Sequence, residues 1–188
     1  IVVGGDPRLV VRCGWVVDQL GPRVGVADEE AGEVLGLDAE STWASARDGV
    51  SGVGWIESFD ASEFPVRIAA EVKGFDPETV APAKEVRRMD RNVLLAVAAA
   101  KEAWAASGIE EFDAQRVGIL VGSAIGGISS IIDYYEVMKE RGADRVSPFF
   151  IPSVLADTAS GQIAIQLGIT GPNYAPVSAC ASGSTAVG

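Results

Sequence analysis

The sequence contains no histidine among its 188 residues. This absence removes the side chain that most often serves as a general base near neutral pH, and also the commonest ligand of transition metals. A nucleophile in this chain that needs a histidine partner does not find one here. We therefore expect no metal site, and any acid–base chemistry must use other groups.

Cysteine is also scarce, with Cys13 and Cys180 as its two instances. They lie far apart and match neither a disulfide framework nor the spacing of a metal site. Such sparse use of cysteine favours the cytoplasm as the compartment.

Long apolar segments are missing as well. No run of about 18 apolar residues is free of charge, so the sequence predicts no transmembrane helix. The opening I-V-V-G-G-D lacks the charged start of a signal peptide. Because the chain begins at Ile1 without a methionine and stops soon after Cys180, we expect it to be a fragment.

Positive charge is in short supply, since 15 Lys and Arg face 26 Asp and Glu and the net charge is −11. This balance argues against nucleic acid as a partner. One local exception is Lys84, Arg87, Arg88 and Arg91, whose spacing places them on one face of a helix predicted from Ala83 onward. The pattern leaves two interpretations open, an ordinary solvated face or a docking site for an acidic partner.

The residues that are abundant indicate a packed α/β protein, with 48% hydrophobic residues and 22 glycines. Strands and helices alternate, which predicts a mostly parallel sheet between helices. The segment 1–36 is left unassigned, with possible strands at 1–3 and 8–11 and a strand or helix at 15–20. Beyond it we expect a helix starting at Ser41 and ending near Asp48, a loop at 52–65, strands at 66–72 and 116–122, and helices at 92–107, 128–141 and 153–167.

The last stretch, Asn173–Gly188, predicts the most specific chemistry. Residues 173–178 suit a short buried strand, and small residues then run through a sharp turn into a helix. Cys180 lies at this turn, where the helix dipole and free N–H groups favour a thiolate and can hold an oxyanion. The arrangement has the logic of a nucleophile elbow. The competing interpretation, a small buried hydrophobic cysteine, has similar weight on the local pattern alone.

The string G-S-A-I-G-G after the strand at 116–122 invites comparison with dinucleotide-binding loops. Those loops need G-x-G-x-x-G, and the middle glycine is missing here. The pattern therefore disfavours nucleotide binding.

Several strings together carry a family resemblance: G-L-D-A-E-S-T-W, K-E-V-R-R-M-D, G-I-L-V-G-S-A-I-G-G, S-P-F-F-I-P-S, G-I-T-G-P-N and V-S-A-C-A-S-G. Residues 37–188 resemble the N-terminal half of β-ketoacyl-acyl carrier protein synthases, most closely the type II elongating enzyme of bacterial fatty acid synthesis. The resemblance implies a thiolase-like fold, cut just after the elbow. Residues 1–36 do not match the family.

The resemblance also implies roles for individual residues. Cys180 resembles the nucleophile that accepts an acyl chain, and its N–H resembles one of two oxyanion donors. The residues that resemble carrier-protein docking positions are Lys84, Arg87, Arg88 and Arg145. Those that resemble acyl-pocket positions are Ile125, Phe149 and Phe150.

The family's partners and missing parts follow in the same way. We expect acyl and malonyl thioesters on an acyl carrier protein, a homodimer, and no cofactor of the enzyme's own, because phosphopantetheine arrives on the carrier. The family's two catalytic histidines, a lysine and the second oxyanion donor belong to the half that is absent here, so this fragment alone is expected to be inactive.

Three alternatives stay open. The chain can be a truncated carrier-binding protein without catalysis, which the lack of histidine favours, or a polyketide ketosynthase, or a thiolase. The basic stripe and the S-P-F-F segment favour a carrier-dependent synthase over a thiolase. Neither the pathway nor the acyl chain length follows from the sequence.

Overall fold

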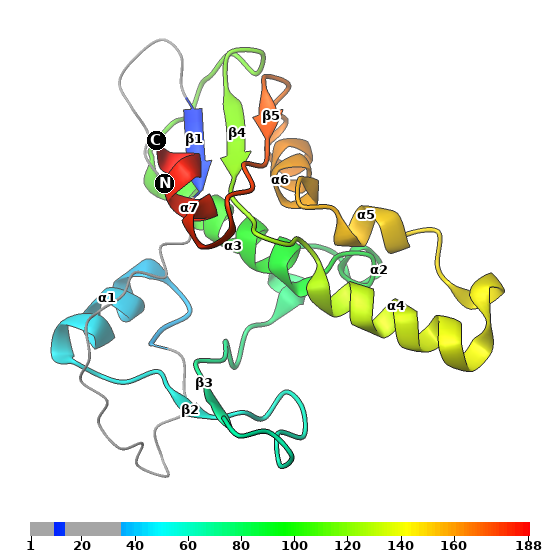
Figure 1. Ribbon diagram of the computed structural model, residues 1–188. Helices are drawn as coiled ribbons and strands as arrows, with labels where there is room; N and C mark the ends of the chain where they lie inside the picture. The colour runs from blue at the N-terminus through cyan, green and yellow to red at the C-terminus, as the bar shows by residue number, and fades with distance from the viewer. Residues whose placement is uncertain (1–9, 14–34) are drawn as a thin grey trace. The chain divides into compact units, whose positions relative to one another are not determined.

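The computed structural model describes residues 10–13 and 35–188, and the chain divides into two compact units (Figure 1). One unit comprises Ile1–Val17 with Pro77–Gly188, and the other comprises Asp18–Asp76. Each unit is described by itself. The elements predicted at 1–3 and 15–20 lie outside the described residues.

The first unit is built on a parallel sheet of three strands in the order β1 (Val10–Cys13), β4 (Gly118–Val121) and β5 (Asn173–Tyr174). The register pairs Cys13 with Val121 and Ile119 with Asn173, in both cases parallel. The strand predicted at 116–122 is confirmed, and the strand expected at 8–11 lies at 10–13. The predicted parallel α/β architecture is therefore confirmed.

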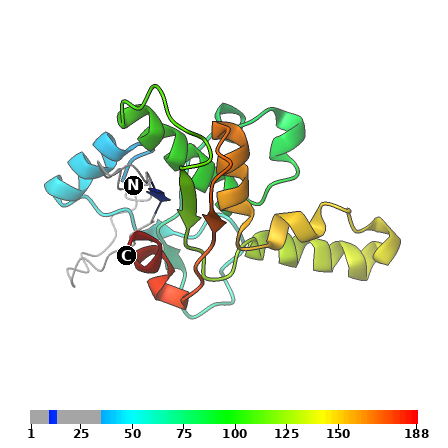
Figure 2. The same ribbon diagram turned by 90° about the horizontal axis from the view of Figure 1, so that it is seen from above.

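Helices cover both faces of this sheet. α3 (Arg91–Ala106) and α6 (Thr158–Leu167) pack together on one face, and α7 (Ser182–Val187) lies on the other (Figure 2). Strand β4 runs between these layers as a near-continuous apolar segment, as expected for a strand covered on both faces. The core residues of this unit include Val93, Val97, Val117, Ile119 and Ile163.

The helix predicted from Ala83 through Arg91 is wrong. α2 spans only Ala83–Val86, and α3 starts separately at Arg91. The break comes from Asp90, which is extended and whose carboxylate accepts a hydrogen bond from Asn92 N–H at 3.0 Å as the N-cap of α3. The basic residues before and after it therefore do not share one helical face.

The helix predicted at 128–141 is confirmed as α4 (Ile128–Arg141), followed by a 3-10 turn at Ala143–Arg145. The next prediction, a loop through Pro152 and one long helix after it, is wrong. Helix α5 (Phe150–Val154) comes first, and the extended residue Leu155 separates it from α6. Pro152 is tolerated because it lies in the first turn of α5, where a missing N–H breaks no helical bond.

Strand β5 is shorter and more exposed than predicted. Only Asn173–Tyr174 pair with β4, and the Tyr174 side chain is exposed. Within the described residues β5 is an edge strand, and Pro176 has no N–H to donate to a ladder. The prediction of a buried strand through residue 178 is therefore wrong.

The second unit consists of a capped helix and a short hairpin. α1 (Ala39–Asp48) begins at Asp38, whose carboxylate accepts a hydrogen bond from Ser41 N–H at 2.7 Å. Because α1 starts at Ala39, the predicted start at Ser41 is two residues late. β2 (Gly54–Trp55) pairs antiparallel with β3 (Ile68–Ala69), so the strand predicted at 66–72 is much shorter and the predicted loop contains a strand.

A carboxylate closes the hairpin. Glu71 accepts hydrogen bonds from the N–H groups of Glu57 and Ser58, at 2.9 and 3.2 Å, and from the Ser58 hydroxyl. The Ser58 hydroxyl is the main cause that holds the pKa of Glu71 below its ordinary value. Lys73 adds an ion pair to Glu57 at 2.6 Å.

In the first unit, the turn after β4 touches the helix that follows Cys180. A Cβ on Gly122 would overlap the backbone carbonyl of Ser182. The two backbones therefore approach as closely as only glycine permits.

The Glu71 network predicts a dependence of stability on pH. Because the folded pKa of Glu71 is depressed, its contribution is present above the ordinary glutamate value of about 4.3 and is lost as the pH falls through the folded value. Urea unfolding midpoints measured from pH 6 to pH 3 should fall less steeply for Glu71→Gln than for the wild type. Glu63→Gln, at an exposed glutamate outside the network, should behave like the wild type. Parallel curves for Glu71→Gln and the wild type would contradict this prediction.

The contact at Gly122 predicts opposite effects for two identical substitutions. Gly122→Ala should destabilise the protein by about 1–3 kcal/mol, because the overlapping atoms are backbone and cannot rotate away. Gly161→Ala, inside α6 with nothing near the added Cβ, should stabilise by about 0.5–1 kcal/mol through helix propensity. Thermal denaturation of both variants compares them directly, and a Gly122→Ala variant as stable as Gly161→Ala would disprove the close approach.

Candidate functional site

Cys180 lies at the centre of a sharp turn that follows β5. Residues Ala179–Ala181 form a 3-10 turn that runs directly into α7. Ala179 has a φ of 50°, and among the described residues it is the only non-glycine with a positive φ. Such backbone is costly for an alanine and is held only where the surroundings enforce it.

Ser182 is the side chain that holds this turn. It is buried, its hydroxyl donates to the Ala179 carbonyl at 2.8 Å, and it accepts from Ser178 N–H at 2.9 Å. A second pair, Ser178 and Thr185, joins hydroxyl to hydroxyl at 2.7 Å. Hydrogen bonds therefore hold the residues on both sides of Cys180, and Cys180 itself takes part in none of them.

The Cys180 thiol is free and exposed. Within the part of the chain that the structure describes, neither its thiol nor its N–H makes a hydrogen bond. The sulfur is thus open to an incoming electrophile, and the amide beside it is open to an oxygen that develops negative charge. This exposure differs from that of a cysteine serving as a small core residue.

Ile125 lies in the turn that follows β4, and Cys180 lies in the turn that follows β5. Because the two strands are parallel neighbours, both turns leave the same edge of the sheet. Ile125 is 62% exposed, while Gly126 and Gly127 on its far side are buried against backbone of residues 153–156. The isoleucine therefore projects from a rigid turn on the same sheet edge as the elbow.

Three of the predicted docking residues lie together. Lys84 is in α2, Arg87 is its C-cap and Arg88 follows in the turn before Asp90, and all three are exposed. Arg145 is not brought to them within this unit. It belongs to the turn between α4 and α5, at the far end of that helical pair (Figures 1 and 2). There it lines an open hollow of about 550 Å³ with Tyr134, Val137 and Arg141.

The two adjacent phenylalanines take different directions. The guanidinium carbon of Arg88 lies 4.1 Å from the centre of the Phe149 ring. The Phe150 ring instead packs edge-on against Tyr134 of α4, with ring centres 5.2 Å apart. The structure thus separates two residues to which the sequence assigned one role.

Asp90 and Ser182 are positioning residues that the sequence analysis did not identify. Asp90 is 4% exposed, and its second carboxylate oxygen accepts from Ser130 N–H of α4 at 2.8 Å. The signal was available, since an aspartate directly before an apolar helix is a frequent N-cap. It was masked by the assumption of one continuous helix. Ser182 carried no signal beyond its place among small residues.

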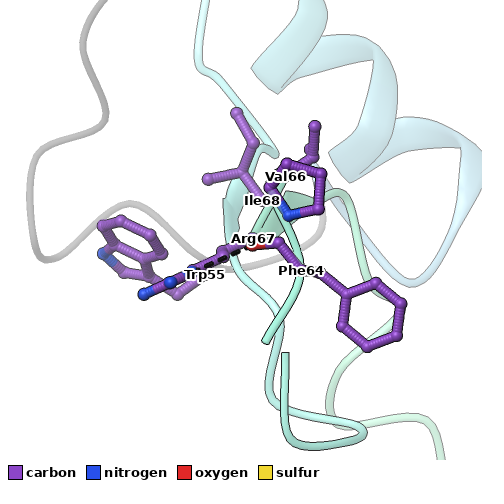
Figure 3. A pocket seen from close by; sticks show the side chains of 6 residues that line it. Trp55, Phe64, Val66, Arg67 and Ile68 are labelled. Atoms are coloured by element: carbon purple, nitrogen blue, oxygen red, sulfur yellow. Dashed lines mark hydrogen bonds between the residues drawn. The ribbon is translucent and has the colours of Figure 1, made fainter. Parts of the chain in front are cut away.

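The second unit has a hollow of its own, of about 530 Å³, between Trp55, Phe64 and the segment from Pro65 to Ile68 (Figure 3). Among the described residues that line it, Arg67 is the only charged one, and its Nε donates to the Phe64 carbonyl at 3.2 Å. None of these described lining residues is an acid, a general base or a nucleophile.

Two further searches concern residues 10–13 and 35–188. They contain no group of three or more His, Cys, Asp or Glu side chains placed to hold a metal ion. None of the helices described there is both long enough and apolar enough to cross a membrane.

The sequence of this chain is similar to those of known proteins. Residues 32–188 match the model of the family described as "Beta-ketoacyl synthase, N-terminal domain". The chain is 41% identical over 156 residues to a Staphylococcus aureus protein named 3-oxoacyl-[acyl-carrier-protein] synthase 2, covering 82% of this chain and 39% of that protein. A Coxiella burnetii protein of the same name is 42% identical over 156 residues, covering 82% and 38%. The chain thus spans about two fifths of the length of these relatives.

Solved structures agree on the fold. The ishigamide ketosynthase/chain length factor matches with a TM-score of 0.66 and 27% identity, over 74% of this chain and 36% of that one. A beta-ketoacyl synthase from Burkholderia phymatum matches with a TM-score of 0.64 and 26% identity, over 79% and 37%. Both have a fold similar to that of this chain over about three quarters of its length. With a family model that covers residues 32–188, the chain belongs to the β-ketoacyl synthase family and contains that family's N-terminal domain.

Proposed function

We propose that the protein acts as a β-ketoacyl-acyl carrier protein synthase, an acyltransferase that elongates acyl chains in fatty acid biosynthesis. The observation that carries this proposal is the exposed Cys180, held on a fastened turn at one edge of the sheet. The relatives named 3-oxoacyl-[acyl-carrier-protein] synthase 2 support the substrate class.

The first step is acyl transfer. The Cys180 sulfur attacks the carbonyl carbon of an acyl thioester on the carrier's phosphopantetheine. The oxygen of the tetrahedral intermediate then accepts a hydrogen bond from the backbone N–H of Cys180. The carbon–sulfur bond to phosphopantetheine then breaks. The carrier leaves with a free thiol that takes up the proton lost from Cys180.

The second step forms the new carbon–carbon bond. A malonyl thioester loses CO₂, and the electron pair left on its α-carbon attacks the acyl group on Cys180. The bond to the Cys180 sulfur breaks, which restores the thiolate and releases a β-ketoacyl carrier. Decarboxylation needs a donor for the enolate oxygen, and because these 188 residues include no histidine, any imidazole donor lies outside them.

Other residues have roles around these two steps. Ile125 borders the acyl path next to the elbow, and Phe150 belongs to the pocket wall with α4. No cofactor is required of the protein itself, because phosphopantetheine arrives on the carrier. The proposed compartment is the cytoplasm, which the sparse use of cysteine favours.

A homodimer is the assembly that we propose. Helix α4 has no buried residue, and it carries apolar side chains at helical spacing that are 36–55% exposed: Ile128, Ile131, Ile132, Tyr135 and Met138. A stripe of this kind is stable in water when another protein surface covers it.

Two other functions have specific support. A polyketide ketosynthase is favoured by the structural likeness to the ishigamide ketosynthase/chain length factor. A carrier-binding protein without catalysis is favoured by the absence of histidine from this chain. The first differs from our proposal in the acyl chain that it accepts, and the second in lacking condensation activity.

The nucleophile proposal predicts one acylated residue. When the natural-length protein is incubated with an acyl carrier thioester, mass spectrometry should find the acyl group on Cys180. Cys180→Ala should lower the rate of acyl transfer by about 10³-fold or more, because the attacking atom is gone. Cys13→Ala should retain transfer. Acyl groups on Cys13, or unimpaired transfer in Cys180→Ala, would refute the assignment.

The docking proposal predicts a dependence on charge. Reversing Arg87 and Arg88 together to glutamate should weaken the affinity for acyl carrier protein by at least about tenfold, since an acidic partner then meets like charge. Added salt should weaken binding of the wild type as well. Arg47→Glu with Arg116→Glu changes the net charge equally and should bind normally. Equal losses in both double variants would show that only net charge matters.

A further inference from the structure

The contact between Arg88 and Phe149 joins two segments that lie far apart in the sequence. Arg88 follows α2, and Phe149 directly precedes α5, yet the guanidinium lies 4.1 Å above the centre of the ring. A cation over an aromatic face is attracted by the negative charge density of the ring, and arginine stacks there in preference to lysine.

Both ends of the contact are held by their own backbone. Arg88 N–H donates to the Glu85 carbonyl at 2.9 Å, and Arg88 lies two residues before the buried Asp90. Phe149 N–H donates to the Ser147 hydroxyl at 3.1 Å, and its carbonyl accepts from Ser153 N–H at 3.0 Å. The ring and the guanidinium therefore meet because their main chains are fixed.

The charge of Arg88 stays available. In the described part of the chain, Arg88 forms no ion pair with a carboxylate. Lys84 and Arg87 expose two more positive charges beside it. The surface around the contact is thus positive in a protein whose net charge is −11.

A ring beneath a guanidinium changes how the arginine meets an anion. Stacking uses the face of the guanidinium and leaves the N–H groups at its edge for a carboxylate, which they can grip with two bonds. It also restricts a long, flexible side chain before the partner arrives, so less conformational freedom is lost on binding. Phe149, although uncharged, can therefore raise the affinity for an acidic partner.

We propose that Phe149 is a positioning residue of the docking surface, a platform that holds Arg88 for an acidic carrier protein, and that it does not line the acyl pocket. The proposal rests on the proposed function, which supplies the carrier as the partner. It separates Phe149 from Phe150, whose ring contacts Tyr134 instead of Arg88. Charge complementarity argues for the carrier as occupant, because carrier proteins of this class are acidic.

The test measures the dissociation constant of the natural-length protein for a holo acyl carrier protein, which carries phosphopantetheine without an acyl chain. Phe149→Leu should weaken binding about two- to fivefold, as expected for the loss of one exposed cation–π contact. Phe149→Tyr, which keeps the ring, should bind like the wild type. Phe150→Leu makes the same change one residue away and should leave this dissociation constant unaltered.

A double-mutant cycle shows whether the ring acts through the arginine. In an Arg88→Met background, Phe149→Leu should cause no further loss of carrier affinity. The rate of Cys180 acylation by a small acyl thioester without a carrier should be unchanged by Phe149→Leu, because docking plays no part in that reaction. Phe149→Met serves as the second ring-free variant if the leucine variant does not fold.

The outcomes separate this inference from the proposed function. If the wild type does not bind the carrier, carrier docking itself is refuted, and the platform with it. If the wild type binds the carrier but Phe149→Leu and Phe150→Leu have the same dissociation constant, only the platform role of Phe149 is refuted. The same holds if Phe149→Leu weakens binding as much in the Arg88→Met background as in the wild type. If Phe149→Leu slows the acylation of Cys180 by the small thioester, Phe149 lines the acyl pocket after all, and the proposal is refuted.

Discussion

One buried carboxylate joins the parts of the first unit that the proposed chemistry uses. Asp90 is 4% exposed, caps α3 through Asn92 N–H and accepts from Ser130 N–H in the first turn of α4. Removing a buried acceptor of this kind leaves two amide groups without a partner, at a cost of about 1–3 kcal/mol for each. The turn before Asp90 carries Arg87 and Arg88, and the turn before α4 carries Ile125. The proposed docking surface and the proposed acyl path are therefore held by the same side chain.

Close approaches between backbone segments fix the turns around Cys180 in a similar way. Gly122 leaves room for the Ser182 carbonyl, and Gly127 leaves room for the Ser153 carbonyl and for Asp90 itself. The turn after β4 is thus clamped between α7 on one side and α5 with Asp90 on the other. This explains why small residues gather in two separate stretches of the sequence, around residue 125 and around residue 180. At Gly122, Gly126 and Gly127, backbone from another element occupies the space that a side chain would need.

The fold was predictable where the pattern depends on local residues alone. The apolar strand at 118–121, the long helix at 128–141 and the parallel arrangement all follow from periodicity and from the alternation of elements. The errors arose where one side chain overrides the pattern. Asp90 splits a helix that the basic spacing made continuous, and Leu155 splits another. β5 is short because Pro176 cannot extend the ladder, and its exposure depends on neighbours that no local pattern records.

For the candidate site, the sequence singled out Cys180, the proposed nucleophile, but not the side chains that hold its turn. Cys180 stood out because a reactive residue interrupts a run of small ones, and Ser182 did not because it looks like one of them. The same limit applies to Phe149 and Phe150. Because the two residues are adjacent and both aromatic, the sequence analysis gave them the same role. In the structure the Phe149 ring contacts Arg88, and the Phe150 ring contacts Tyr134 of α4. A contact across 61 positions of sequence has no local signature. Here it links the proposed docking surface to the start of α5, whose first residue, Phe150, belongs to the proposed pocket wall. If both proposals hold, the same contact fixes the surface that binds the carrier and the wall of the pocket.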